Sequence, residues 1–266
     1  MKYVTISRED EKSKELEAKI RERIKGTYTT ENPDICIAVG GDGTLLGASH
    51  LYPNAIIFGI HTGHLGFYCN YMDGDVDTLV SDINNSTYKV DEIEQLRCDM
   101  KDSKGKLITN YALNEIAIIT PVGTAMLDVF ISGEYLERFR GSGFCISTPT
   151  GSTGFNKSLD GAVVDLSIKG MQLTEIAGIN SNAYRSLKSS LILAADKRIK
   201  LVSPENSHVF ITVDNMPYDI KDFDSLEVYY DNHKLKMAYH NLESYLKRIN
   251  RAFSILKEWF LWKKIF

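Results

Sequence analysis

Apolar and polar positions follow two different patterns along the chain. In the N-terminal part, residues 35–39 and 55–60 are continuous apolar runs, as in parallel strands that are covered on both faces. Leu16 and Ile20 instead lie four apart among charged residues, which marks one apolar stripe of a helix. Strands that alternate with helices predict an α/β domain over residues 1–92 with a parallel sheet. Its expected strands are residues 2–6, 35–39 and 55–60, and its expected helices are residues 9–24, 45–51 and 76–83.

Beyond about residue 88 the pattern changes to short strand-like runs that are separated by turn residues. This succession predicts a mainly β second domain over residues 93–239, interrupted by a helical stretch at 159–179. The expected strands are residues 95–102, 112–120, 127–132, 135–140, 144–147, 199–202, 208–213, 226–230 and 235–238.

The C-terminal residues 242–266 again show helical spacing, with Leu246, Ile249 and Phe253 on one face. We expect residues 240–266 to pack back on the first domain or on a sister subunit, because aromatic residues are common anchors in interfaces. A basic amphipathic helix on a membrane surface is the alternative interpretation.

Composition and charge narrow the class of protein. The 266 residues include 31 Lys+Arg and 35 Asp+Glu, and 43% are hydrophobic, as in an ordinary globular protein. The net charge of -4 argues against a nucleic-acid partner, and the lack of about 18 consecutive apolar residues argues against a membrane partner. The start of the chain lacks a signal-peptide pattern and the four cysteines are far apart, so we expect free thiols in the cytoplasm, without a zinc site or disulfide.

The segment Gly40-Gly41-Asp42-Gly43-Thr44 follows a predicted strand and precedes a predicted helix. Its glycines permit a tight turn, and its backbone N–H groups can bind phosphate at the positive end of the helix. A carboxylate repels such an anion, so Asp42 suits a residue that orients a hydroxyl, accepts its proton or faces Mg²⁺. The alternative role for Asp42 is a helix N-cap.

Residues 147–158, with the sequence STPTGSTGFNKS, form the second candidate segment. Their hydroxyl groups can bind a phosphorylated or polyhydroxylated ligand, while Gly and Pro fix the loop. A linker of ST-turns between a strand and a helix is the alternative interpretation.

Together these two segments resemble the NAD kinase family, in particular the compact Gram-positive type. Residues 40–44 match its GGDGT motif, which diacylglycerol-type lipid kinases and phosphofructokinases share, and residues 148–158 match its more specific TPTGST loop. The Asn114-Glu115 pair and residues 59–67 match two further motifs. The resemblance implies an α/β nucleotide-binding domain, a β-rich domain, and transfer of the γ-phosphate of ATP to the 2′-hydroxyl of the adenosine ribose of NAD.

The resemblance also implies roles for individual residues. Asp42 corresponds to the proton acceptor for the 2′-hydroxyl, Gly41 and Gly43 lie beside the nucleotide, and Phe67 lines the adenosine pocket. The remaining positions implied to contact the nucleotides are Asn114, Glu115, Arg140, Ser142, Thr150, Thr153, Gly154, Phe155, Asn156, Lys157, Ser158, Ala177 and Asn215. In a homo-oligomer, some of these residues act across a subunit interface.

Several positions depart from the family pattern. Gly154 and Phe155 replace the usual Ala-Tyr, so the ring is kept and the hydroxyl is lost. Asp160 stands where a glycine is usual, Ser142 where related members have Asp, and Asn215 where some have His or Gly. These changes affect nucleotide recognition and leave Asp42 untouched.

The partners implied by the resemblance are small-molecule nucleotides, a divalent metal such as Mg²⁺, and further copies of the chain in a homodimer or homotetramer. His61 and His64 could chelate a metal, but their flanking glycines favour a turn near the nucleotide, and no metal-binding residue is assigned. A diacylglycerol-type lipid kinase and a non-catalytic NAD(P)-binding sensor are the alternative functions. The 148–158 loop argues against the first, and the intact Asp42 argues against the second.

Overall fold

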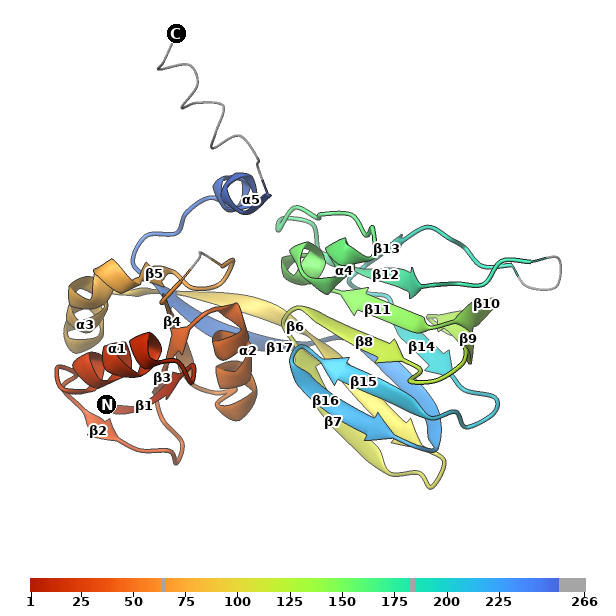
Figure 1. Cartoon of the computed structure of the whole chain (residues 1–266), viewed down its shortest axis with the longest axis horizontal. Coiled ribbons are helices and arrows are strands. Elements are labelled where there is room, and N and C mark those ends of the chain that lie inside the picture. Colours follow the sequence, from red (N-terminus) through yellow and green to blue (C-terminus); the bar gives the residue numbers. More distant parts are fainter. Residues whose placement is uncertain (64–65, 182–184, 254–266) are drawn as a thin grey trace, which may run out of the picture. The chain divides into compact units, whose positions relative to one another are not determined.

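The computed structural model describes residues 1–63, 66–181 and 185–253, and its chain divides into two compact units. Unit 1 comprises Met1–Glu92 and Leu235–Phe266, and unit 2 comprises Ile93–Lys234 (Figure 1). The chain passes from one unit to the other within two long strands, β6 (Lys89–Asp102) and β17 (Phe223–Tyr239).

Unit 1 contains the predicted parallel sheet. Its strands follow the order β2-β1-β3-β4, and β4 also pairs in parallel with β5 and with the end of β17. The apolar runs of β3 and β4 are buried almost throughout, as expected of strands covered on both faces. The strands are β1 (Lys2–Ser7), β2 (Thr27–Tyr28), β3 (Ile35–Gly40), β4 (Ile56–His61) and β5 (Tyr71–Met72).

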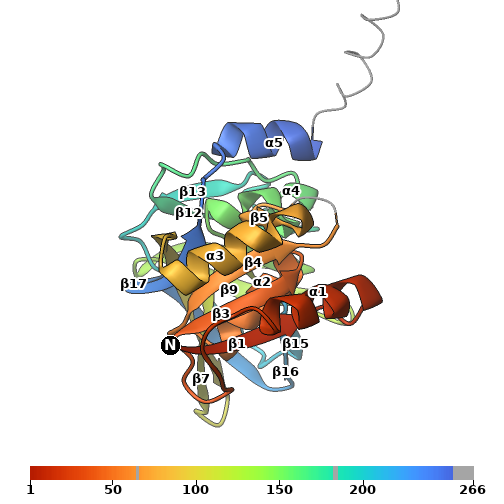
Figure 2. The same cartoon turned by 90° about the vertical axis from the view of Figure 1, so that its left-hand side faces the viewer.

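Helices cover both faces of this sheet. α1 (Glu11–Arg21) and α3 (Val76–Asn85) lie on one face, and α2 (Asp42–Leu51) lies on the other (Figures 1 and 2). Ile20 of α1 and Leu79 of α3 are buried in one cluster with the sheet, because each lies on the apolar stripe of its helix. A 3₁₀ turn, η1 (Asp73–Asp75), leads into α3.

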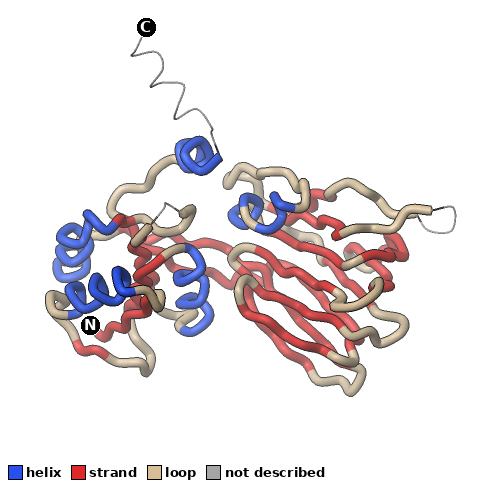
Figure 3. The backbone as a smooth tube through the Cα atoms, viewed as in Figure 1, coloured by secondary structure: helices blue, strands red, loops and turns tan. Residues whose placement is uncertain are grey.

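Unit 2 consists of two β-sheets with one shared hydrophobic core, and Figure 3 shows helix only near the loop at 150–158. Within the first sheet the order is β10-β9-β14-β17-β6-β7, and within the second, wholly antiparallel sheet it is β13-β12-β11-β8-β15-β16. Besides β6 and β17, the strands of unit 2 are β7 (Leu107–Ala112), β8 (Glu115–Ile119), β9 (Ala125–Ile131), β10 (Glu134–Gly141), β11 (Gly143–Ser147), β12 (Gly170–Ile176), β13 (Leu191–Ala194), β14 (Ile199–Val202), β15 (Val209–Val213) and β16 (Met216–Ile220). Its short helices are η2 (Thr150–Thr153) and α4 (Phe155–Ser158).

An α/β domain followed by a mainly β domain is therefore confirmed, but the helical stretch predicted at 159–179 is wrong. Residues Gly170–Ile176 form β12, which pairs with β11 on one side and β13 on the other. These pairings are non-local, and they override a local pattern that is compatible with a helix. The run predicted at 112–120 corresponds to β8, and in unit 2 the strands β7, β13 and β16 were not predicted.

The C-terminal helix α5 spans Tyr245–Phe253 and belongs to unit 1, and the rest of the predicted helix lies outside the described residues, as does the 259–266 tail. The ring of Phe253 lies 5.8 Å from that of Phe67, so α5 contacts the protein's own chain. Among the described helices, none is long and apolar enough to cross a membrane.

A buried carboxylate joins α3 to the sheet of unit 1. Asp82 is 2% exposed, and it accepts hydrogen bonds from the hydroxyls of Tyr71 (2.9 Å) and Thr87 (2.7 Å). Nδ1 of His240, just after β17, lies 2.9 Å from the same carboxylate. Asp82 therefore links three separate segments, and among its partners the Tyr71 hydroxyl is the one that is fully buried.

Replacing Asp82 with alanine should lower the free energy of unfolding of unit 1 by about 2 kcal/mol, because the buried Tyr71 hydroxyl loses its acceptor. The shift in the urea midpoint measures this loss. Asp77→Ala on the same helix is the matched control, since Asp77 only forms an exposed ion pair with Arg23, worth at most about 0.5 kcal/mol. Equal midpoints for the two variants would contradict the role of Asp82.

Candidate functional site

The Gly40–Thr44 segment forms a tight turn from β3 into α2. A Cβ atom on Gly40 would lie 2.3 Å from Oγ1 of Thr44, so a larger residue there would displace the Thr44 side chain. Gly41 is the N-cap residue and Asp42 is the first residue of the helix, so the interpretation of Asp42 as the N-cap is wrong. Asp42 is therefore free to act outside its own helix.

The Asp42 carboxylate binds the segment that follows β4. Oδ2 accepts a hydrogen bond from the N–H of Phe67 (2.6 Å), and Oδ1 accepts one from the N–H of Tyr68 (3.1 Å). A Cβ atom on Gly66 would lie 2.2 Å from this carboxylate, so the approach requires glycine at that position. The two donors fix the orientation of the carboxylate, which remains partly accessible at the carboxyl edge of the parallel sheet.

The carboxyl ends of β3 and β4 are joined at the same edge. The N–H of Thr62 donates to the carbonyl of Gly40 (2.9 Å), and the hydroxyl of Thr62 lies 2.8 Å from that of Ser13. Nδ1 of His61 accepts from the N–H of Gly63 (3.0 Å), which is the turn expected for this segment, whereas His64 lies outside the described residues. No cluster of three or more His, Cys, Asp or Glu side chains suited to a metal occurs in the described part of the chain.

A second polar cluster lies in unit 2, around the turn that links β7 to β8. The carboxylate of Asp214 accepts from the N–H groups of Leu113 (2.8 Å), Asn114 (2.7 Å) and Glu115 (3.2 Å). Asp214 has φ of 52° in the two-residue turn between β15 and β16, where Asn215 is its neighbour. Asp214 was not identified from the sequence, although an Asp-Asn pair between two apolar runs indicates a turn.

The loop after β11 supports the same turn from the other side. The Thr148 hydroxyl donates to the carbonyl of Leu113 (2.7 Å), and the Thr150 hydroxyl donates to it as well (3.0 Å). A Cβ atom on Gly151 would lie 2.0 Å from the carbonyl oxygen of Asn114. The two segments that were predicted separately, Asn114-Glu115 and the TPTGST loop, are thus in direct contact.

Glu115 carries a perturbed carboxyl group at this contact. Burial, reinforced by the charge of Asp214, raises its pKa from 4.5 to about 8, although the N–H of Phe155 donates to it. Its Oε2 atom is buried without a hydrogen-bond partner among the described residues. A Cβ atom on Gly154 would lie 3.1 Å from Oε2, so the glycine at this position leaves room for the carboxyl group.

The other predicted residues of this loop differ in exposure. Asn156 is buried, and its amide donates to the carbonyl of Ala162 (3.3 Å) while its oxygen accepts from Thr174 (2.8 Å). Asp160 has φ of 61°, in the left-handed region that favours glycine, which gives a physical reason for the usual glycine there. Thr153 is half-buried, whereas Phe155, Lys157 and Ser158 are exposed.

Three predicted residues lie away from this cluster. Arg140, Ser142 and Ala177 are grouped, because the carbonyl of Arg140 accepts from the N–H of Ile179 and the N–H of Ser142 donates to the carbonyl of Ile176. They flank the Gly143 end of β11, whereas the Thr148 loop follows its Ser147 end. At about 3.3 Å per residue, the strand separates the two groups by roughly 16 Å.

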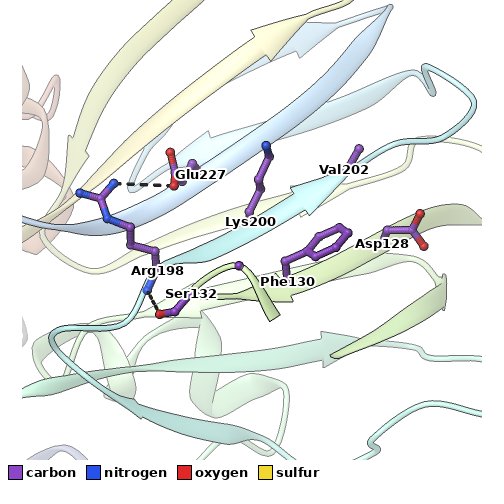
Figure 4. Close-up of a pocket in the computed structure, with 8 residues that line it drawn as sticks. Asp128, Phe130, Ser132, Arg198, Lys200, Val202 and Glu227 are labelled. Carbon is purple, nitrogen blue, oxygen red and sulfur yellow. Dashed lines mark hydrogen bonds and ion pairs between the residues drawn. The ribbon is translucent and has the colours of Figure 1, made fainter. Parts of the chain in front are cut away.

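A separate pocket on unit 2 contains none of the predicted residues (Figure 4). Arg198 lies 3.6 Å from the carboxylate of Glu227, and its guanidinium stacks on the ring of Tyr229. The pocket is lined by Asp128, Phe130, Ser132, Gly133, Arg198, Lys200, Val202 and Glu227.

The raised pKa of Glu115 predicts a pH-dependent stability. Because the folded state favours the protonated carboxyl, its contribution is complete below the ordinary pKa of 4.5, falls as the pH rises, and is lost above about 8. Glu115→Gln should therefore gain stability relative to the wild type between these values, measured by urea unfolding at a series of pH values. A difference between the two proteins that stays constant with pH would contradict the assignment.

Comparisons with known proteins agree with this arrangement. The family model "ATP-NAD kinase N-terminal domain" matches residues 2–88, and "ATP-NAD kinase C-terminal domain" matches residues 113–238. NAD kinases of Staphylococcus aureus strains JH9 and Newman are each 38% identical over 263 residues, which is 95% of this chain and 97% of theirs.

Two solved structures share the fold. Yeast NADH kinase complexed with NADH has a TM-score of 0.82 at 19% identity, covering 96% of this chain and 88% of its own. An NAD kinase from Archaeoglobus fulgidus in complex with ATP has a TM-score of 0.73 at 20% identity, covering 94% and 99%. The two matched domains and the extent of the sequence identity show that this chain belongs to the NAD kinase family.

Proposed function

We propose that this chain is an ATP-dependent NAD kinase that transfers the γ-phosphate of ATP to the 2′-hydroxyl of the adenosine ribose of NAD. The observation that carries the proposal is the oriented Asp42 carboxylate beside the glycine turn, in a chain of this family. A ribose hydroxyl is a poor nucleophile, and a carboxylate within hydrogen-bond reach orients it and accepts its proton as the phosphoryl group is transferred.

The glycine turn has a separate part in this chemistry. Gly41 and Gly43 leave the backbone open at the N-terminus of α2: apart from its own helix backbone and chain neighbours, no atom of the described residues lies within 4 Å of a Cβ placed on Gly43. Phosphate oxygens can approach such N–H groups closely, where the helix dipole favours their charge. We therefore assign the phosphates to this turn.

Mg²⁺ fits this edge as part of the ATP substrate. Carboxylate oxygens are preferred Mg²⁺ ligands, and Mg²⁺ in kinases is held by one or two carboxylates together with phosphates. Asp42 is assigned to the ribose hydroxyl, so we assign no side chain of this protein to the ion, which the phosphates of ATP would hold. Bound Mg²⁺ would spread the charge of the transferring phosphoryl group.

In unit 2 we assign recognition of the adenosine part of NAD to Asn114, Glu115 and the 150–155 loop. The buried and unpaired Oε2 of Glu115 supports this assignment, because a ribose hydroxyl would satisfy it. Phe67 of unit 1 is half-buried, and we assign its ring to the adenosine pocket. Asn156 would act through the loop, since its amide is engaged within the protein.

We also propose that the enzyme works as a homo-oligomer, a homodimer or homotetramer, in which Arg140, Ser142 and Ala177 serve the site of a second copy. Their place at the opposite end of β11 from the Thr148 loop supports this interpretation. We expect the enzyme to act in the cytoplasm, since its four cysteines are buried free thiols. The comparisons favour neither the lipid kinase nor the non-catalytic sensor.

The proposal predicts NADP formation from NAD, ATP and Mg²⁺ by the wild type. Asp42→Asn should lower kcat by about 10²- to 10⁴-fold, the usual contribution of a positioned acid or base, while NAD still binds. A coupled NADP assay together with calorimetric NAD binding measures both effects. If kcat is undiminished, Asp42 has no part in the transfer; if the wild type binds NAD without turnover, the sensor interpretation takes its place.

The oligomer proposal predicts complementation between two inactive variants. Asp42→Asn and Arg140→Ala should each be impaired alone, and co-assembly should restore about a quarter of wild-type activity, because a mixed dimer combines one intact Asp42 with one intact Arg140. The test compares the activity of the two variants when they are co-expressed with their activity when they are purified separately and mixed without subunit exchange. Activity equal to the sum of the separate variants would contradict a shared site.

A further inference from the structure

The peptide group between Phe67 and Tyr68 is held at both ends by charged side chains of unit 1. Its N–H donates to Oδ1 of Asp42 at 3.1 Å. Its carbonyl accepts a hydrogen bond from Nη1 of Arg248, on helix α5. Because a peptide group is planar, fixing the carbonyl oxygen also fixes the direction of the N–H on the other side.

Arg248 is placed for this contact by further interactions. It is 9% exposed, and its Nη2 donates to Oδ1 of Asn70 at 2.6 Å. The ring of Phe67 lies 6.3 Å from that of Tyr245 and 5.8 Å from that of Phe253, at either end of α5. The helix therefore contacts the Phe67–Asn70 segment through a guanidinium group and two aromatic rings.

The charge of Arg248 also acts on this peptide group. Burial lowers its pKa, whereas the carboxylates of Glu243 and Asp42 oppose that change. Arginine nevertheless stays charged in proteins, so a cation and an anion polarise the same peptide group from its two ends. Burying a charged group costs free energy, and an apolar side chain could pack the helix on this segment without that cost. An apolar side chain would not polarise the peptide group.

We propose that Arg248 is a positioning residue for phosphoryl transfer, acting through the Phe67–Tyr68 peptide group to orient the Asp42 carboxylate. The inference rests on the proposed function of Asp42, and it gives α5 a part in the reaction. A small displacement of a reacting group can cost about a hundredfold in rate. Arg248 thus influences the transfer without touching the substrate.

The test compares Arg248→Met with Arg251→Met on the same helix. Methionine keeps an unbranched apolar side chain and removes the donors, and Arg251 only pairs with Glu243 at the surface. Arg248→Met should lower kcat by about 10- to 100-fold with KM for NAD and ATP little changed. Arg251→Met should keep both constants, and Arg248→Lys, which retains a charge and a donor, should fall in between.

A double-mutant comparison with Asp42→Asn distinguishes a positioning effect on the Asp42 carboxylate from a general loss of structure. In an Asp42→Asn background, Arg248→Met should cost little further activity, because both changes remove the same oriented carboxylate. Full additivity of the two losses, or wild-type kcat in Arg248→Met, would overturn the proposal. Arg248→Lys provides the same comparison if the methionine variant does not fold.

Hydrogen exchange tests the contact independently of activity. In Arg248→Met the amides of Phe67 and Tyr68 should exchange faster than in the wild type, and Arg251→Met should leave them unchanged. Unchanged exchange in Arg248→Met would also overturn the proposal. Failure of the wild type to form NADP would instead refute the proposed function, and the exchange result would still show whether Arg248 holds this peptide group.

Discussion

The two hydrogen bonds that the Asp42 carboxylate accepts from the N–H groups of Phe67 and Tyr68 are the interactions on which the candidate site of unit 1 depends. They require a glycine turn after β3, a glycine at position 66 where a Cβ atom would collide, and a parallel sheet whose strands end at the same edge. A carboxylate beside a turn that binds phosphate repels the phosphate, so the position of this carboxylate relative to the N–H groups of the turn has to be fixed. The N–H groups of Phe67 and Tyr68 fix it by donating to Asp42.

Unit 2 uses the same device for a different purpose. The Asp214 carboxylate binds three successive N–H groups and thereby shapes the turn that presents Asn114 and Glu115. Burial of the Glu115 carboxyl, together with the charge of Asp214, raises the pKa of Glu115 to about 8. One carboxylate thus organises the backbone, and its neighbour is kept in a state suited to hydrogen bonding with a neutral ligand group.

The sequence allowed the α/β order, most strands and the position of Asp42 after β3 to be predicted, because apolar runs and glycine turns are local signals. β12 was mistaken for part of a helix because its partners, β11 and β13, are distant in the chain. The donors to Asp42 lie 25 and 26 residues away, and Arg248 contacts Phe67 across 181 residues, so neither contact has a local signature. Motif resemblance selected Asn114, Glu115 and the 150–158 loop together, but only the fold placed Arg140, Ser142 and Ala177 at the other end of β11.

The fate of the transferred phosphate distinguishes an NAD kinase from the alternative activities. Wild-type protein would be incubated with Mg²⁺, NAD and ATP labelled at the γ-phosphate, and the dinucleotide product would be tested with an NADP-specific dehydrogenase. We expect label in a product that the dehydrogenase reduces, which would place the phosphate on the 2′-hydroxyl. Label that stays in ATP or inorganic phosphate, or that is transferred to diacylglycerol when this is supplied, would contradict this expectation.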